Sequence, residues 1–194
     1  LVDTGYSMSV DTMSALDVWT LAFLFGFQIY FDFSAYSHIA LGSASLMGIH
    51  FPENFNFPYL AASPKDFWRR WHISLSSWIR DYLYLPLAGV NVHDRSVGGL
   101  ANATLDKKKN KVLLTTWAIM GLWHGANWTF ILWGAYHSVM ILLYRRISSY
   151  TRNLNQNFRA MGGIILTLPL MMLAWIPFRA ESLTITVGMW SKIV

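Results

Sequence analysis

The chain has 194 residues, of which 54% are hydrophobic and only 13% are charged, and its formal net charge is +5. Ten tryptophans, nine tyrosines and twelve phenylalanines exceed what a soluble core of this length needs, which indicates a membrane protein in contact with a lipid bilayer. The basic residues lie in short segments between apolar runs, a pattern typical of cytoplasmic loops in polytopic proteins rather than of nucleic-acid binding. The absence of cysteine excludes disulfides, zinc–thiolate sites and thiol nucleophiles.

The first long apolar stretch covers residues 15–31, is interrupted by Asp32 and Ser34, and resumes over residues 35–49. Crossing about 30 Å of hydrocarbon takes roughly 20 helical residues. The pattern therefore predicts either one long broken helix or a tight pair of helices. It also places Asp32 within the membrane region, where we expect the carboxylate to pair with an arginine or with hydroxyl groups inside the bundle.

A loop is predicted over residues 51–58, followed by a helix that starts at Ser63, with Pro64 in the first turn and Asp66 at the third position. One arc of this helix is aromatic and aliphatic, and comprises Phe67, Trp68, Trp71, Leu75, Trp78, Ile79 and Tyr82. The opposite stripe contains Arg69, His72, Ser76 and Arg80. Such a helix suits a membrane interface or the wall of a water-filled cavity. We expect it to end near Pro86 and Gly89.

Two basic segments, residues 91–111 and 145–159, are predicted to be cytoplasmic loops. Segment 112–144 between them is too short for two full crossings and too long for one, since a continuous helix would be about 50 Å long. We therefore expect it to enter the membrane, turn near residues 121–127 and return. A spanning helix with Pro169 inside it is predicted over residues 160–178, and Arg179 and Glu181 mark its exit.

The predicted turn contains His124, and an imidazole at membrane depth is functional by default. A neutral imidazole in a pocket has a pKa that suits a general base. Asn127, the indole N–H of Trp123 and the backbone amides near Gly125 are candidate donors to a developing oxyanion. The alternative for His124 is a structural histidine bonded to a carbonyl of a neighbouring helix.

For His72, a structural hydrogen-bonding role and a catalytic role are both open. Arg69, Arg70 and Arg80 are expected to anchor phosphates or lipid headgroups. The lysines of residues 107–111 are expected to set topology and could also attract an anionic donor.

His137 is expected to pack or to line a cavity. No metal site is expected, because no His-x-x-x-His or carboxylate spacing of the zinc type occurs. No Gly-x-Ser-x-Gly elbow points to a serine nucleophile.

Four blocks of sequence closely resemble the membrane-bound O-acyltransferase (MBOAT) family, and within it the bacterial alginate O-acetyltransferase branch, which is related to the D-alanyl transfer protein of teichoic acid modification. In order they are Tyr30-Phe31-Asp32-Phe33-Ser34-Ala35-Tyr36-Ser37, Asp66-Phe67-Trp68-Arg69-Arg70-Trp71-His72-Ile73-Ser74-Leu75-Ser76, Arg80-Asp81-Tyr82-Leu83-Tyr84-Leu85-Pro86-Leu87 and Trp123-His124-Gly125-Ala126-Asn127-Trp128. The resemblance covers most of the chain, from about residue 30 to residue 179.

The resemblance implies an all-α, multi-pass protein of the bacterial cytoplasmic membrane, with interfacial and re-entrant or broken helices around a central pocket. Residues 1–194 would be a single fragment of this membrane domain, with N-terminal helices and a C-terminal end outside it, since the sequence begins with Leu1 and ends inside an apolar run. His124 matches the family's catalytic histidine, and His72 matches a second histidine of this branch.

The implied activity moves an acetyl group from a cytoplasmic thioester, either acetyl-CoA or an acyl-carrier thioester, with no bound cofactor. The acceptor would be a hydroxyl of an extracytoplasmic polysaccharide, or a partner acetyltransferase that passes the group on. Two other functions stay open. A transporter subunit would use Asp32, His72 and His124 as a proton relay, and a noncatalytic scaffold would dock a separate transferase.

Overall fold

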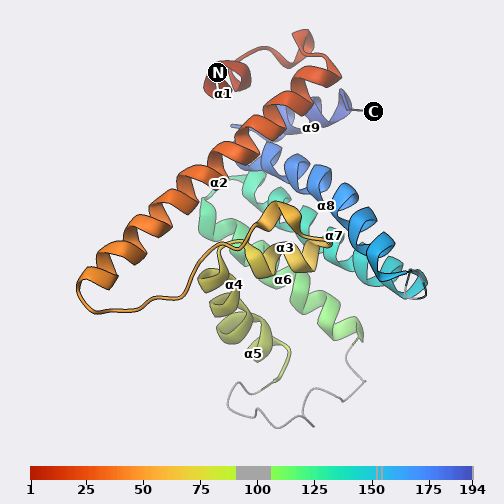
Figure 1. The fold of residues 1–194 in the computed structure, drawn as a ribbon. Coiled ribbons are helices and arrows are strands. Elements are labelled where there is room, and N and C mark those ends of the chain that lie inside the picture. The colour runs from red at the N-terminus through yellow and green to blue at the C-terminus, as the bar shows by residue number, and fades with distance from the viewer. Residues whose placement is uncertain (91–105, 152, 154, 194) are drawn as a thin grey trace.

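A computed structural model describes residues 1–90, 106–151, 153 and 155–193, and every regular element in this part of the chain is helical, as the sequence predicts (Figure 1). The elements in chain order are α1 (Val2–Tyr6), η1 (Val10–Thr12), α2 (Ala15–Leu46), η2 (Pro58–Leu60), α3 (Pro64–Arg70), α4 (Ile73–Ile79), the π-helical turn η3 (Arg80–Tyr84), α5 (Leu85–Leu87), α6 (Asp106–His124), α7 (Trp128–Tyr150), α8 (Gln156–Arg179) and α9 (Leu183–Ser191).

Helix α2 is a single helix of 32 residues, so the predictions of a break at Asp32 and of a helix pair are both wrong. It begins at Ser14, whose hydroxyl accepts a hydrogen bond from the N–H of Asp17 while the Asp17 carboxylate accepts one from the Ser14 N–H. Asp32 lies on an exposed face of the helix, where its carboxylate does not disturb the main-chain hydrogen bonds. The helix is about 48 Å long at 1.5 Å per residue.

Helices α2 and α8 are long and apolar enough to cross a membrane, judged by length and composition. Only 28% of the most apolar window of α2 and 39% of that of α8 are buried inside the structure. The apolar side chains that remain exposed on these two helices include Phe31, Tyr36, Ile39, Leu46, Ile165 and Leu166. So much exposed apolar surface suits contact with lipid.

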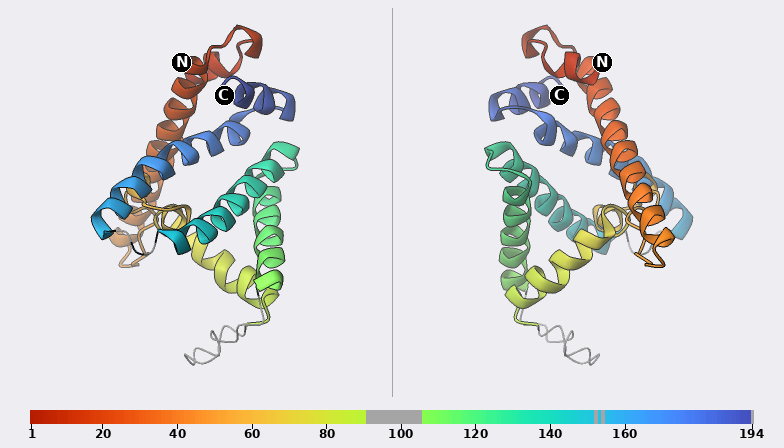
Figure 2. Two further views of the ribbon diagram at one scale, coloured as in Figure 1. Left: turned by 90° about the vertical axis from the view of Figure 1, so that its right-hand side faces the viewer. Right: turned by 90° about the vertical axis from the view of Figure 1, so that its left-hand side faces the viewer.

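Helices α6 and α7 form an antiparallel hairpin whose turn lies at residues 125–127, which confirms the predicted turn. The two helices approach closely at glycines. A Cβ atom at Gly121 would overlap the main-chain carbonyl oxygen of Phe130, and one at Gly134 would overlap that of Trp117. Figure 2 shows the two legs separating away from the turn, with α4 and α5 lying across the open end.

The legs of this hairpin are longer than the segment of residues 112–144 predicted from the charge pattern. They contain 19 and 23 residues, which corresponds to about 28 and 35 Å. Helix α6 begins before Lys111, and α7 continues past Arg145 and Arg146, so these basic residues extend the helices instead of forming loops. Most of the predicted basic loop, residues 91–105, lies outside the described residues, as does residue 152.

The helix predicted from Ser63 begins as expected, because the Ser63 hydroxyl accepts a hydrogen bond from the N–H of Asp66. It is not continuous, however, and this part of the prediction is wrong. Trp71 is extended and His72 has left-handed backbone angles, φ 43° and ψ 58°, so α3 ends and α4 starts in a new direction. The segment ends after α5 at Gly89, where φ is +76°.

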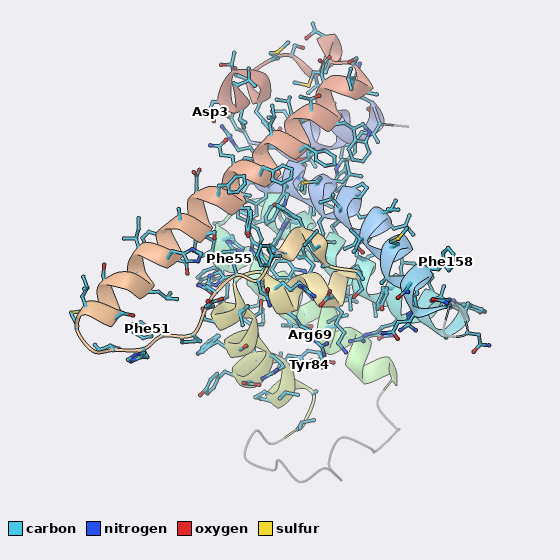
Figure 3. The ribbon with its side chains drawn as sticks, viewed as in Figure 1. Asp3, Phe51, Phe55, Arg69, Tyr84 and Phe158 are labelled. Atoms are coloured by element: carbon cyan, nitrogen blue, oxygen red, sulfur yellow. The ribbon has the colours of Figure 1, made fainter. Side chains whose placement is uncertain are left out.

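An aromatic core joins α2, α3, α8 and the loop that precedes α3. Trp71 stacks on Phe67 with ring centroids 5.6 Å apart, and Phe55 meets Trp71 edge to face at 5.1 Å. Figure 3 shows Phe55 in the middle of the molecule, whereas Phe51 and Phe158 lie at its outside. The helix predicted over residues 160–178 is confirmed as α8, and it contains Pro177 in addition to Pro169.

We predict that Gly134→Ala destabilises the hairpin, because the new methyl group would overlap the main chain of α6, which has no flexible side chain to move away. The expected loss is about 1–3 kcal/mol, measured as the thermal or denaturant stability of the detergent-solubilised protein. Gly162→Ala in α8 is the control, since nothing lies within 4 Å of its Cβ position. Equal stability of the two variants would contradict the close approach of α6 and α7.

Candidate active site

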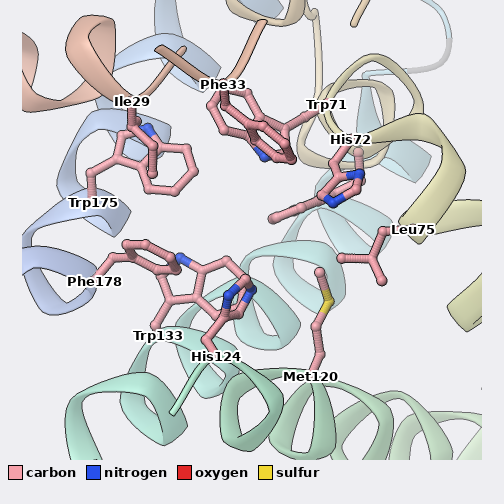
Figure 4. A pocket seen from close by; sticks show the side chains of 11 residues that line it. Ile29, Phe33, Trp71, His72, Leu75, Met120, His124, Trp133, Trp175 and Phe178 are labelled. Carbon is pink, nitrogen blue, oxygen red and sulfur yellow. The ribbon is translucent and has the colours of Figure 1, made fainter. Parts of the chain in front are cut away.

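Both histidines highlighted by the sequence line one cavity of about 50 Å³ near the centre of the molecule, and we call it the histidine cavity (Figure 4). It is enclosed by α2, α3, α4, α6, α7, α8 and the break between α3 and α4. The lining residues are Ile29, Phe33, Trp68, Trp71, His72, Leu75, Met120, His124, Trp133, Trp175 and Phe178. Apart from the two imidazoles, the wall is aliphatic and aromatic.

His124 is the last residue of α6, at the start of the hairpin turn. Its half-buried ring meets the ring of Trp133 edge to face at 5.0 Å and that of Phe178 at 5.0 Å. Within the described part of the chain its side chain makes no hydrogen bond, so the contact with a helix carbonyl expected of a purely structural histidine is not formed there. The imidazole nitrogens are available to a ligand in the cavity.

His72 enters the same cavity from the break between α3 and α4. Its Nδ1 lies 3.2 Å from Oδ1 of Asn54, and its ring meets Phe33 edge to face at 4.7 Å. Burial lowers the pKa of His72, which favours a neutral ring at pH 7. The left-handed main chain at a residue other than glycine costs of order 1–3 kcal/mol and is frequent at functional sites.

Trp133 supplies a polar group that sequence reasoning did not identify. The residue is 1% exposed and lines the histidine cavity, and its indole N–H has no hydrogen-bond partner among the described residues. An unpaired buried donor is costly. The indole N–H of Trp175, which also lines the cavity, has no partner among the described residues either, but it is the ring of Trp133 that packs against His124. One of ten tryptophans, Trp133 carries no sequence signal that would single it out.

Two candidate oxyanion donors from the sequence, Asn127 and Trp123, do not line the histidine cavity. Asn127 caps α7: its Oδ1 accepts a hydrogen bond from the N–H of Thr129, and its Nδ2 donates to the carbonyl oxygen of Glu181. Trp123 is 62% exposed and packs beside His124 with ring centroids 4.9 Å apart. Asn127 therefore supports the turn that carries His124.

The remaining charged candidates also lie outside the histidine cavity. Asp32 is exposed on α2, with no hydrogen bond or ion pair to another described residue, so the expected pairing inside the bundle is not found. Arg69 is exposed at the end of α3, and Arg70 forms an ion pair with Asp66 at 3.1 Å. Arg80 forms an ion pair with Asp81 at 2.7 Å.

A second cavity of about 190 Å³ lies next to the first, and we call it the basic cavity. Lys65, Arg80 and Arg145 all line it, and it shares Trp68 and Met120 with the histidine cavity. These two side chains therefore separate one cavity from the other.

His137 is 1% exposed and packs behind this boundary, as expected from the sequence, with the indole N–H of Trp68 3.4 Å from its Nδ1. In the described part of the chain, no group of three or more His, Asp or Glu side chains is arranged to hold a metal ion.

Comparison with known proteins gives consistent matches. The model of the family described as MBOAT, membrane-bound O-acyltransferase family, matches residues 2–178. The chain is 42% identical to the probable alginate O-acetylase AlgI of Azotobacter vinelandii, in an alignment that covers 100% of this chain and 35% of the relative. It is 36% identical to the peptidoglycan O-acetyltransferase of Helicobacter pylori, over 93% of this chain and 32% of the relative.

A more distant relative is the teichoic acid D-alanyltransferase of Streptococcus thermophilus, 31% identical over 80% of this chain and 40% of the relative. The chain thus spans between 32% and 40% of the length of these three proteins.

We predict that Asn127→Ser keeps the function of the hairpin turn, whereas Asn127→Ala weakens the turn. A serine hydroxyl can accept the hydrogen bond from Thr129, but alanine cannot, and loss of the cap costs about 1 kcal/mol. The measurement is the stability of each variant together with its rate of acyl transfer per folded molecule. A folded Asn127→Ser protein with little activity would show that the amide itself contacts the substrate.

Proposed function

The chain belongs to the membrane-bound O-acyltransferase family, and from this premise we propose that it carries the catalytic centre of an O-acetyltransferase of the bacterial cytoplasmic membrane. The observation that carries the proposal is that His124 and His72, far apart in the sequence, face one small apolar cavity. A narrow cavity walled by aromatic rings suits a short acyl group better than a long chain.

In the proposed reaction, His124 acts as the general base. Its imidazole removes the proton of an acceptor hydroxyl as that oxygen attacks the thioester carbonyl. The tetrahedral intermediate then collapses, the carbon–sulfur bond breaks, and the departing thiolate takes the proton from His124. The products are an acetyl ester and a free thiol. An unpaired imidazole in an apolar cavity supports this role, because nothing among the described residues competes for its lone pair.

Negative charge develops on the carbonyl oxygen during the attack, and a donor aimed at this oxygen lowers the barrier. We assign this role to the indole N–H of Trp133. It is buried, it has no partner among the described residues, and its ring packs against that of His124. In this proposal it replaces Asn127 and Trp123, the donors expected from the sequence.

The basic cavity is the proposed site of the thioester donor. Acetyl-CoA and acyl-carrier thioesters both have phosphate groups, which Lys65, Arg80 and Arg145 can bind. The thioester end would pass Trp68 and Met120 to reach the histidine cavity, since these two side chains line both spaces. Of the three arginines expected to anchor phosphates, this geometry supports Arg80.

The proposed acceptor is a hydroxyl outside the cytoplasm, either on a cell-envelope polysaccharide or on a partner acetyltransferase. Two of the relatives are named for acetylating alginate and peptidoglycan, which supports a polysaccharide as the final acceptor. A proton relay through Asp32, His72 and His124 finds no support in this geometry, because Asp32 is exposed and does not line the histidine cavity.

We predict that His124→Ala abolishes transfer of the acetyl group from radiolabelled acetyl-CoA in membranes that carry the whole protein. Loss of a general base costs about 10²–10⁴-fold in rate. The control is His38→Ala, which removes an exposed histidine of α2 outside both cavities and should transfer at the wild-type rate. Transfer by His124→Ala at the wild-type rate, with matched expression, would favour a noncatalytic scaffold.

We also predict that Trp133→Phe lowers kcat by about 10²-fold while the KM for acetyl-CoA changes little, because it removes a donor to the transition state and keeps an aromatic ring. Trp190→Phe is the matched control, since the N–H of Trp190 donates to the carbonyl oxygen of Leu173 away from the cavity. A wild-type kcat in a folded Trp133→Phe protein would remove Trp133 from the mechanism.

A further inference from the structure

We propose that Asn54 is a positioning residue for His72: its side-chain oxygen holds the imidazole with the proton on Nδ1, which leaves the lone pair of Nε2 to accept a hydrogen bond from a substrate group other than the hydroxyl that His124 deprotonates. The effect of Asn54 on catalysis rests on the proposed acetyltransferase function. The hydrogen-bonding pattern that carries the proposal stands independently of that function.

The orientation of the Asn54 amide follows from its other partners. The main-chain N–H of Ser74 lies 3.1 Å from the atom placed as Oδ1, and the hydroxyl of Ser74 lies 2.9 Å from it. A backbone N–H can only donate a hydrogen bond, so the atom that it faces must be the amide oxygen rather than the amide nitrogen. The assignment of this oxygen is therefore fixed by chemistry.

The same oxygen lies 3.2 Å from Nδ1 of His72. An amide oxygen has lone pairs and no proton, so the contact is favourable only if His72 carries its proton on Nδ1. In the neutral ring the second nitrogen, Nε2, then has the lone pair. A histidine that lines a catalytic cavity is thereby held in one of its two neutral forms.

Asn54 also supports the main chain at the break between α3 and α4. Its carbonyl oxygen accepts a hydrogen bond from the N–H of Ile73 at 3.0 Å, and two residues later the N–H of Asn56 donates to the carbonyl oxygen of Arg70 at 2.9 Å. These bonds lie on both sides of His72, whose left-handed backbone costs about 1–3 kcal/mol. One loop residue thus contributes both to the conformation of His72 and to its protonation.

Among the described residues that line the histidine cavity, none is an aspartate, glutamate, lysine or arginine. His124 is the other titratable residue among those that line the cavity. His72 contacts Phe33 and Asn54. The carboxylates beside these residues in the sequence belong to Asp32 and Glu53, and both are exposed. A neutral amide at position 54 lets His72 stay neutral, whereas a carboxylate there would stabilise the protonated ring. An asparagine at position 54 therefore suits a neutral His72 that accepts a hydrogen bond from the substrate.

The test compares three variants of the whole protein in membranes, assayed with radiolabelled acetyl-CoA across pH. Asn54→Ala should lower kcat by up to about 100-fold with little change in KM, since the ring loses its orientation. Asn54→Asp keeps an acceptor oxygen and should restore much of this rate. It should also move the acid limb of the pH–rate profile to higher pH, because a carboxylate raises the pKa of His72. Asn56→Ala, with an exposed side chain, should behave as wild type.

The protonation of His72 can be measured directly by nitrogen-15 NMR of histidine-labelled wild-type protein, with the His72 signals identified by their loss in His72→Gln. The expected spectrum has a protonated Nδ1 and an unprotonated Nε2 at neutral pH. A proton on Nε2 would overturn the proposal. The protonation is read from the wild-type protein, and a folded His72→Gln variant serves only to assign the signals.

The two proposals fail in different ways. If His124→Ala transfers acetyl groups like wild type, the proposed function fails, while the NMR spectrum still tests Asn54. If transfer needs His124 but both Asn54 variants keep the wild-type kcat and pH profile, the role of Asn54 fails and the acetyltransferase stands.

Discussion

The hydrogen bonds between the loop before α3 and residues 72–74 are the constraint on which the site depends. They fix a sharp change of direction at His72, so that α3 packs into the aromatic core through Phe67 while α4 turns toward α6. If residues 64–79 formed one straight helix, the His72 ring would lie away from the cavity. The left-handed conformation is unfavourable by itself, and it persists because Asn54 offers several partners at once.

The opposite wall depends on how closely two helices can approach. Glycines at positions 121 and 134 bring α6 against α7, and the turn that Asn127 caps places His124 over Trp133. The cavity between these walls is mostly apolar, and its polar groups are two imidazoles and the indole N–H groups of its tryptophans, among them the unpaired one of Trp133. In such surroundings each hydrogen bond to a reacting group is stronger than it would be in water. Trp68 and Met120 separate this cavity from a neighbouring one that is lined by three cationic side chains.

The sequence predicts the helical fold, the start at Ser63 and the turn near His124, because each follows from local signals such as a cap, a glycine or a change of polarity. The break at His72 cannot be predicted in this way, since no proline or glycine marks it and its partner Asn54 is distant along the chain. Whether Asp32 faces inward depends on the packing of α2, which periodicity does not reveal. The family resemblance identifies the two histidines but not Trp133 or Asn54, whose roles come from contacts.

The central claim is that the acyl group reacts between His72 and His124. The most direct test is a cryo-EM structure of the whole protein with a nonhydrolysable thioether analogue of acetyl-CoA. The account predicts density for the acetyl end in the histidine cavity, with its carbonyl oxygen near the indole N–H of Trp133 and the phosphates beside Lys65, Arg80 and Arg145. An acetyl end bound outside the histidine cavity, with both imidazoles uncontacted, would contradict it.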